Sequence, residues 1–333
     1  MNVFELTRAL VDIESITENE EQLGHALFAH VAELAAGSGG RAELIPVEPR
    51  RNNIFAWWDD PILTFSTHMD TVPPFFPSRE DAEHIWGRGA CDTKGIIAAM
   101  IFAVRDLLAA GRRNLALLFV VGEERNSAGA LVAARSPRGS RFLINGEPTE
   151  NKLALGSKGA LRLELDAHGR MAHSAYPELG ESAIEKLLDA LAQVRSVALP
   201  VDPVLGRSTL NIGTIAGGRA PNVIPDHARA ELFIRLVDSG DSTLAAIQRA
   251  VNGKVEVREP LRIPAQLLGT LPGFETTVVS FTTDIPALGP GWGRPFLIGP
   301  GSIHVAHTLE ERIPKAQILE AIEIYKRMVQ QLL

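Results

Sequence analysis

The sequence predicts an α/β fold with two parts: a mainly parallel sheet covered by helices, and a smaller α+β layer inserted into the chain. Through the first 150 residues, short apolar segments of strand character alternate with segments whose apolar residues have helical spacing. This alternation is typical of a parallel sheet that is covered on both faces. After about residue 156, the expected strands alternate between apolar and charged residues, which indicates a sheet with one exposed face.

The first part of the chain is expected to form helices and buried strands in turn. Apolar residues recur at helical spacing over residues 2–13 and 18–34, and Thr17 is a suitable N-cap for the second helix. Residues 93–110 predict a third helix, which Gly111 ends from a C-cap position. The expected strands are short and apolar, and they cover residues 54–58, 62–67, 115–121 and 141–144.

The later part of the chain predicts a ferredoxin-like layer, because its elements follow the order strand–helix–strand–strand–helix–strand. They cover residues 160–167, 181–194, 208–215, 228–237, 242–251 and 254–258. Residues 264–273, rich in proline and glycine, would return the chain to the first part, and Pro314 would start a last helix. We therefore expect residues 1–156 and 265–333 to form one domain and residues 157–264 to form an inserted lid.

The composition excludes several classes of protein. The 333 residues include 33 Lys and Arg and 40 Asp and Glu, so the formal charge is −7, and no basic stripe indicates a nucleic-acid binder. The longest apolar run, residues 96–104, is far shorter than the roughly 20 residues of a membrane-spanning helix. The first residues are acidic and lack an apolar signal segment, so we expect a cytoplasmic protein. The single cysteine, Cys91, excludes an internal disulfide and a cysteine-rich zinc site.

Acidic residues and histidines gather in a few short segments. Four lie at the ends of expected apolar strands and a fifth lies near the C-terminus: residues 67–73, 89–95, 122–124, 145–149 and 299–307. In open α/β sheets, sites collect outside the carboxyl ends of the strands, so these segments could meet there. Converging His, Asp and Glu side chains are what a two-metal hydrolytic centre requires. Any one of these acids alone is more often a helix cap or a turn residue than a functional group.

Two details of these segments favour a metal site. Glu123 and Glu124 directly follow an apolar strand, and adjacent carboxylates in a half-buried position repel each other unless a cation compensates them. His68 and Asp70 are suitably spaced for an imidazole that binds a metal through one nitrogen and donates its other N–H to a carboxylate. The motifs H-E-x-x-H of zinc proteases and G-x-S-x-G of serine hydrolases are absent.

The segments together resemble a known family. The motifs H-M-D-T-V-P, G-A-C-D-T-K-G, G-E-E, G-E-P-T and G-P-G-S-I…A-H are similar to those of the acetylornithine deacetylase / succinyl-diaminopimelate desuccinylase family of co-catalytic zinc hydrolases. That family also holds carboxypeptidases, aminoacylases and dipeptidases. The match runs along the whole chain in order and includes a lid signature at residues 173–184. It implies a zinc-peptidase-like catalytic domain with an inserted lid that also serves dimerisation.

The resemblance implies which residues hold two divalent metal ions, Zn²⁺ in the first place and Co²⁺ as an alternative. Asp92 would bridge the two ions. His68 and Glu147 would complete the ligands of one ion, and Glu124 and His307 those of the other.

The resemblance also implies roles in catalysis and in substrate binding. Glu123 would be the general base, and Asp70 would orient the metal-binding imidazole of the preceding strand. His173 of the lid would stabilise the oxyanion, in dimeric members within the site of the partner. Asn222 and Arg235 would contact the substrate carboxylate, although a strand arginine facing solvent is the plain alternative.

The late histidine ligand leaves a choice between His304 and His307, which are three residues apart in one loop. The family motif ends with Ala-His and an acidic stretch, which favours His307 and leaves the role of His304 open.

The first functional hypothesis is an N-acyl-amino-acid deacetylase of the acetylornithine type, with acetylcitrulline and acetyl-lysine variants, in arginine or lysine biosynthesis. Carboxypeptidases, dipeptidases and the desuccinylase of the same family are the alternatives. A binding protein without catalysis is the third hypothesis, and the joint presence of ligands, base and lid histidine argues against it. We expect a homodimer formed through the lid, with a small acylated amino acid or a dipeptide as substrate.

Overall fold

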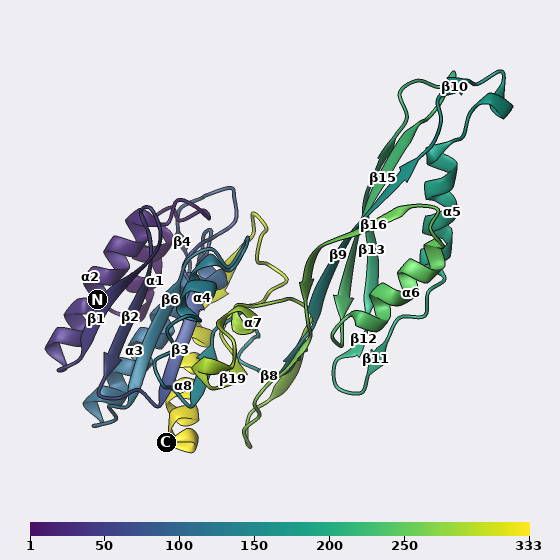
Figure 1. The fold of residues 1–333 in the computed structure, drawn as a ribbon. Helices are drawn as coiled ribbons and strands as arrows, with labels where there is room; N and C mark the ends of the chain where they lie inside the picture. Colours follow the sequence, from purple (N-terminus) through teal and green to yellow (C-terminus); the bar gives the residue numbers. More distant parts are fainter. The chain divides into compact units, whose positions relative to one another are not determined.

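The computed structural model describes all 333 residues, and the chain divides into two compact units (Figure 1). Unit 1 consists of Met1–Leu155, Leu268–Thr277 and Thr283–Leu333, and unit 2 consists of Gly156–Leu267 and Val278–Thr282. Unit 2 therefore includes Val278–Thr282, which the expected borders leave in the catalytic domain. None of the helices is both long and apolar enough to cross a membrane.

Unit 1 contains a six-stranded sheet of β1 (Arg41–Glu48), β2 (Arg51–Trp58), β3 (Leu63–His68), β6 (Leu115–Val120), β7 (Phe142–Asn145) and β19 (Arg294–Leu297). The strand order is β1-β2-β6-β3-β7-β19. Strands β6, β3, β7 and β19 are parallel, which confirms the prediction for this part of the sheet, while β2 pairs antiparallel with β6 and with β1. Strand β1 was not expected, because it is a partly exposed edge strand that contains Pro46.

Helices cover both faces of this sheet, as expected. On one face, α1 (Val3–Val11), α2 (Glu21–Gly37), α3 (Gly95–Ala109) and α8 (Lys315–Leu332) share one hydrophobic core with the strands. On the other face, α4 (Ala128–Ala133), α7 (Ile285–Leu288) and η3 (Pro290–Trp292) pack in a smaller core around Trp292. Helix α3 is buried on nearly all sides, which its almost continuous apolar sequence predicts.

One expected helix end is confirmed and another is wrong. Gly111 follows α3 with a φ of 81°, the left-handed conformation that a glycine adopts after a helix. Thr17 does not cap α2, which begins at Glu21. Its hydroxyl donates instead to Oδ2 of Asp70 at 2.8 Å, so a tertiary contact replaces the local cap.

Unit 2 is a four-stranded antiparallel sheet of β9 (Gly159–His168), β13 (Thr209–Gly217), β15 (His227–Leu236) and β16 (Glu256–Ile263). Helices α5 (Ala183–Arg195) and α6 (Asp241–Val251) pack on one face, and Figure 1 shows them on the same side of the sheet. The strand order β13-β15-β9-β16, with a helix after β9 and after β15, is the ferredoxin-like connectivity. The predicted fold of the insert is therefore confirmed.

The remaining elements are short. Those of unit 1 are β4 (Arg79–Glu80), β5 (His84–Trp86), the helical turn η1 (Ala90–Lys94) and β20 (Arg312–Pro314). Those of unit 2 are β10 (Ala172–His173), η2 (Pro177–Leu179), β11 (Val201–Asp202), β12 (Gly206–Arg207) and β14 (Val223–Ile224). At the borders of the units, β8 (Leu153–Ser157), β17 (Gln266–Leu267) and β18 (Thr276–Val279) form a small sheet.

Candidate metal centre

Three adjacent strands of unit 1 bring four of the predicted site residues to one edge of the sheet. Strand β3 ends at His68, β6 is followed by Glu123 and Glu124, and β7 is followed by Glu147. Because these strands are parallel neighbours, their carboxyl ends lie at the same edge. Asp92 joins them from η1, the turn that leads into α3.

Asp92 lies at the centre of the cluster and presents one carboxylate oxygen to each of two histidines. Its Oδ1 is 3.0 Å from Nε2 of His68, and its Oδ2 is 3.4 Å from Nε2 of His307. Oε1 of Glu147 lies 4.0 Å from Nε2 of His68, and Oε1 of Glu124 lies 3.0 Å from Nε2 of His307. The structure therefore brings these side chains together around Asp92, and ligand atoms of His68, Asp92 and Glu124 all lie within 4.8 Å of one another.

The donor atoms fit divalent metal ions. Asp92 and Glu147 are buried, and Oε1 of Glu147 has no hydrogen-bond partner. Burial and neighbouring carboxylates raise the pKa of Glu147 well above its ordinary value, against the opposing effect of His68. A cation would compensate this crowding of acids. Imidazole nitrogen and carboxylate oxygen are also the donors that Zn²⁺ and related ions accept in proteins.

Asp70 connects the histidine of β3 with the loop after β6. Its buried carboxylate accepts from the backbone N–H groups of Glu123 at 3.0 Å and Glu124 at 3.2 Å. Nδ1 of His68 lies 3.0 Å from the Asp70 carbonyl oxygen and 3.6 Å from its carboxylate, so the backbone oxygen is the nearer acceptor. Burial alone would raise the pKa of Asp70, but His68 and the other donors outweigh it and lower the pKa. A donating Nδ1 leaves Nε2 free to face the cluster.

The structure places His307, and not His304, in the cluster. His307 has a positive φ of 62°, an uncommon conformation for a residue other than glycine, and its ring contacts Glu124 and Asp92. His304 is exposed, and its charge acts on Glu150, outside the cluster.

In the metal-free protein, His307 and Glu123 hold protons more tightly than they would in water. Hydrogen bonds to Asp92 and Glu124 raise the pKa of His307 to about 10, although partial burial opposes this. Burial raises the pKa of Glu123 well above its ordinary value. Both groups therefore bind protons more tightly in the folded chain than in the unfolded chain.

We expect the metal-free protein to lose stability as the pH rises from about 6.5 to about 10. Below this range His307 is protonated in both the folded and the unfolded chain. Within the range the unfolded chain loses the proton and the folded chain keeps it, so the free energy of unfolding falls as the pH rises, until the pKa of the folded state is passed. Thermal unfolding in excess chelator across this range measures the effect, and His307→Ala should show a weaker pH dependence. A transition temperature of the metal-free protein that stays constant or rises would contradict the expectation.

Two of the expected lid residues lie side by side in unit 2. His173 is exposed on β10, and its Nδ1 accepts from the N–H of Ala175 at 3.1 Å. Strand β10 pairs with β14, and the N–H of Ser174 donates to the carbonyl oxygen of Asn222 at 3.1 Å. The structure therefore holds His173 and Asn222 together.

Arg235, the third lid residue, lies at the opposite end of the sheet in unit 2. It is eight residues after His227, and His227 pairs with His168 shortly before β10. Eight steps along a strand span about 26 Å. Half-burial lowers the pKa of Arg235, and its guanidinium lies 4.8 Å from the ring of Phe233. Asn222 and Arg235 of one chain therefore cannot hold the same carboxylate, and the expectation that both bind it requires residues from two chains.

Asp284 is an acid near the cluster that no motif indicates. It is buried, neither carboxylate oxygen has a hydrogen-bond partner, and burial raises its pKa to about 7. Its charge acts on His68 and Glu123. Because Asp284 directly precedes α7, the sequence alone cannot distinguish it from an ordinary helix N-cap.

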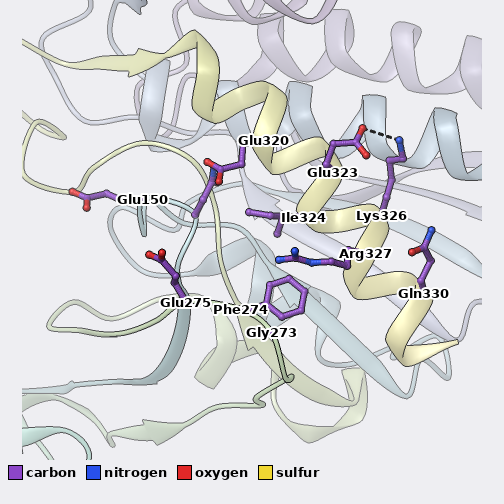
Figure 2. Close-up of a pocket in the computed structure, with 11 residues that line it drawn as sticks. Glu150, Gly273, Phe274, Glu275, Glu320, Glu323, Ile324, Lys326, Arg327 and Gln330 are labelled. Atoms are coloured by element: carbon purple, nitrogen blue, oxygen red, sulfur yellow. Dashed lines mark hydrogen bonds and ion pairs between the residues drawn. The ribbon is translucent and has the colours of Figure 1, made fainter.

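A separate groove of about 590 Å³ runs along α8 (Figure 2). Glu150, Glu275 and Glu320 line part of it, and the guanidinium of Arg327 stacks 4.1 Å from the ring of Phe274. The groove contains none of the predicted site residues. The chemistry that the motifs predict therefore belongs to the cluster around Asp92.

Comparisons with known sequences match nearly the whole chain. The profile of Peptidase family M20/M25/M40 matches residues 64–331. A peptidase M20 domain-containing protein of Schizosaccharomyces pombe is 37% identical over 98% of this chain and 84% of its own length. A protein of Aspergillus fumigatus named probable carboxypeptidase is 39% identical over 97% of this chain and 85% of its own length.

Solved structures share the fold at lower sequence identity. The aminopeptidase PepT of Bacillus cereus aligns with a TM-score of 0.79 and 18% identity, over 99% of this chain and 98% of that chain. An M20 family metallo-carboxypeptidase of Sulfolobus solfataricus aligns with a TM-score of 0.77 and 15% identity, over 100% and 99%. A Bacillus subtilis protein described as a dinuclear metal-binding peptidase aligns with a TM-score of 0.69 and 13% identity, over 99% and 98%. The fold is thus shared by peptidases that act at either end of a peptide.

Proposed function

Because the chain belongs to peptidase family M20/M25/M40, we propose that it is a metal-dependent carboxypeptidase, which hydrolyses the last peptide bond of a short peptide with a free C-terminal carboxylate. The cluster in which Asp92 faces His68 on one side and His307 on the other supports metal-dependent hydrolysis, and the relative named probable carboxypeptidase supports the choice of the C-terminal bond. As a member of this family, the chain is a hydrolase of linear amide bonds.

The relatives favour a carboxypeptidase over the deacetylase that the motifs suggest first. The Aspergillus fumigatus relative, at 39% identity, is named probable carboxypeptidase. The motif resemblance to the acetylornithine deacetylase branch has no counterpart among the relatives described above, and neither has a place in arginine or lysine biosynthesis. The carboxypeptidase alternative therefore becomes the main proposal, and N-acyl amino acids become test substrates.

We propose two divalent metal ions as cofactors, Zn²⁺ first and Co²⁺ as an alternative. His68, Asp92 and Glu147 would hold one ion, and Asp92, Glu124 and His307 the other. The Bacillus subtilis structural neighbour, described as a dinuclear metal-binding peptidase, supports the number of two. Ions held there would polarise the scissile carbonyl and lower the pKa of the attacking water.

Glu123 is the proposed general base. It would take a proton from the attacking water and pass it to the leaving amine. Burial raises the pKa of Glu123 above its ordinary value, which favours the acceptance of a proton from water. Asp70 supports this step by holding the backbone N–H groups of Glu123 and Glu124 and by orienting His68.

We propose that the lid binds the substrate in a homodimer. His173 would donate to the oxyanion, while Asn222 and Arg235 would contact the substrate carboxylate. The separation of His173 and Asn222 from Arg235 along β15 supports a site to which two chains contribute. Strand β13, an edge strand of unit 2 on which Ile215 is exposed, offers a surface for pairing with a second copy.

A panel of dipeptides and tripeptides with free or blocked ends tests the proposal. We expect turnover of peptides with a free C-terminus, including N-blocked ones, and none of the same peptides with an amidated C-terminus. The reason is that the enzyme would recognise the terminal carboxylate through charged and polar side chains. N-acetylornithine, N-acetylcitrulline, N-acetyl-lysine and succinyl-diaminopimelate complete the panel. Turnover confined to these acylated amino acids would restore the deacylase hypothesis, and a requirement for a free N-terminus alone would indicate an aminopeptidase.

A further inference from the structure

A buried ion pair joins Arg88 and Glu311, which are 223 positions apart in the sequence. Nη1 of Arg88 donates to Oε2 of Glu311 at 2.5 Å, and both side chains are 1% exposed. Neither residue belongs to the proposed ligands. Each lies four positions from one of them, Arg88 before Asp92 and Glu311 after His307.

Arg88 also holds the loop that follows His68. Its Nε donates to the carbonyl oxygen of Pro74 at 3.1 Å, and its backbone N–H donates to the carbonyl oxygen of Phe76 at 3.1 Å. Its guanidinium lies 5.1 Å from the ring of Phe76. The guanidinium of Arg88 thus contacts two chain segments. A lysine, whose side chain has a single nitrogen, cannot reproduce this.

Glu311 contacts the turn that carries Asp92. Its Oε1 accepts from the backbone N–H of Asp92 at 3.3 Å and lies 3.8 Å from Sγ of Cys91. Its carbonyl oxygen accepts from the N–H of Gly87 at 3.1 Å. The carboxylate therefore binds the backbone of Asp92 on one side and the Arg88 guanidinium on the other.

We propose that Arg88 and Glu311 form a clamp that positions Asp92 between His68 and His307 and so sets the affinity for the metal ions. This inference rests on the proposed function. The clamp joins three chain segments: the loop that follows β3 and its last residue His68, the turn η1 that carries Asp92, and the loop before β20 that carries His307. Arg88 and Glu311 act as positioning residues, because their side chains contact the backbone around the proposed ligands and not the ligand atoms themselves.

The physical reason for a positioning role is the cost of the pair itself. Burying two charges removes them from water, and apolar residues of the same size often stabilise a fold equally well. Apolar residues could not make the directional hydrogen bonds that the carboxylate and the guanidinium form here with backbone N–H and carbonyl groups. Groups that support metal ligands in this way typically change metal affinity by about 10-fold to 100-fold when removed.

Titration of the metal-free chain with Co²⁺ tests the clamp. Calorimetry measures the affinity and the number of ions bound, and the visible absorption of bound Co²⁺ reports the geometry of the site. Wild type is expected to bind two Co²⁺ ions. Arg88→Lys and Glu311→Gln should weaken Co²⁺ binding by about 10-fold to 100-fold and alter the absorption spectrum. Arg88→Met/Glu311→Met, which leaves no unpaired buried charge, should fold even where a single variant does not, and it should retain the loss of affinity.

Ile247→Ala is the matched control for lower stability, because this side chain is fully buried in the core of unit 2. It should lower the unfolding temperature and leave Co²⁺ binding unchanged. Wild-type affinity and spectrum in the Arg88→Met/Glu311→Met chain would overturn the clamp alone. A wild-type chain that binds no Co²⁺ would overturn the proposed function and the clamp with it.

Discussion

Glu123→Gln is expected to lower kcat by about 10²-fold to 10⁴-fold while the chain still binds two metal ions. Glutamine has nearly the shape of glutamate but cannot take the proton of the attacking water. The hydrogen bond from the Glu123 backbone N–H to Asp70 does not depend on the side chain, so the loop should keep its position. Metal content and steady-state rates on an N-blocked dipeptide measure both parts of the expectation.

The neighbouring acid provides the control for this experiment. Glu124→Gln removes a proposed ligand, whose Oε1 lies 3.0 Å from Nε2 of His307. It should lose metal as well as activity. Equal metal loss in the two variants would show that Glu123 is a ligand, and a fully active Glu123→Gln enzyme would exclude it as the base.

His173→Ala is expected to lower kcat by about 10²-fold to 10³-fold, because a donor to the oxyanion acts only in the transition state. His173 is exposed on β10, and its loss should therefore change the unfolding temperature little. KM should change less than kcat if the imidazole contacts the oxyanion and not the bound peptide.

Mixed dimers test whether His173 acts in the site of the partner. A dimer of His173→Ala with Glu123→Gln would contain one intact site, so an equal mixture should recover about a quarter of the wild-type activity after random exchange in a two-fold dimer. Mixing Glu123→Gln with the double variant Glu123→Gln/His173→Ala is the control and should recover none. Absence of recovery after demonstrated subunit exchange would contradict a site shared between chains.

The elements of the fold were predictable where local pattern and packing agree. The apolar runs that became β3, β6 and β7 are buried on both faces, so their composition alone indicates strands. Strand β1 was missed because pairing with β2, and not burial, holds it in place. Thr17 was misassigned because its hydroxyl binds Asp70, a contact that no local rule contains.

The site residues were predictable where they belong to short sequence motifs. Glu123-Glu124 after β6 and His68-x-Asp70 at the end of β3 are local signals of a cation site. The Arg88–Glu311 clamp has no such local signal in the sequence, because the two residues are far apart in the chain and come into contact only in the folded structure. The choice between deacetylase and carboxypeptidase also lies outside the motifs, since they define the shared metal centre and not the substrate pocket.

Release of the C-terminal residue from an N-blocked dipeptide, measured before chelation, after chelation and after return of Zn²⁺ or Co²⁺, tests the central claim most directly. We expect two metal ions per chain in the active protein, loss of activity together with the metal, and recovery when two ions return. Unchanged release of the C-terminal residue by the metal-free chain would contradict the assignment of His68, Asp92, Glu124, Glu147 and His307 as ligands of a catalytic metal pair.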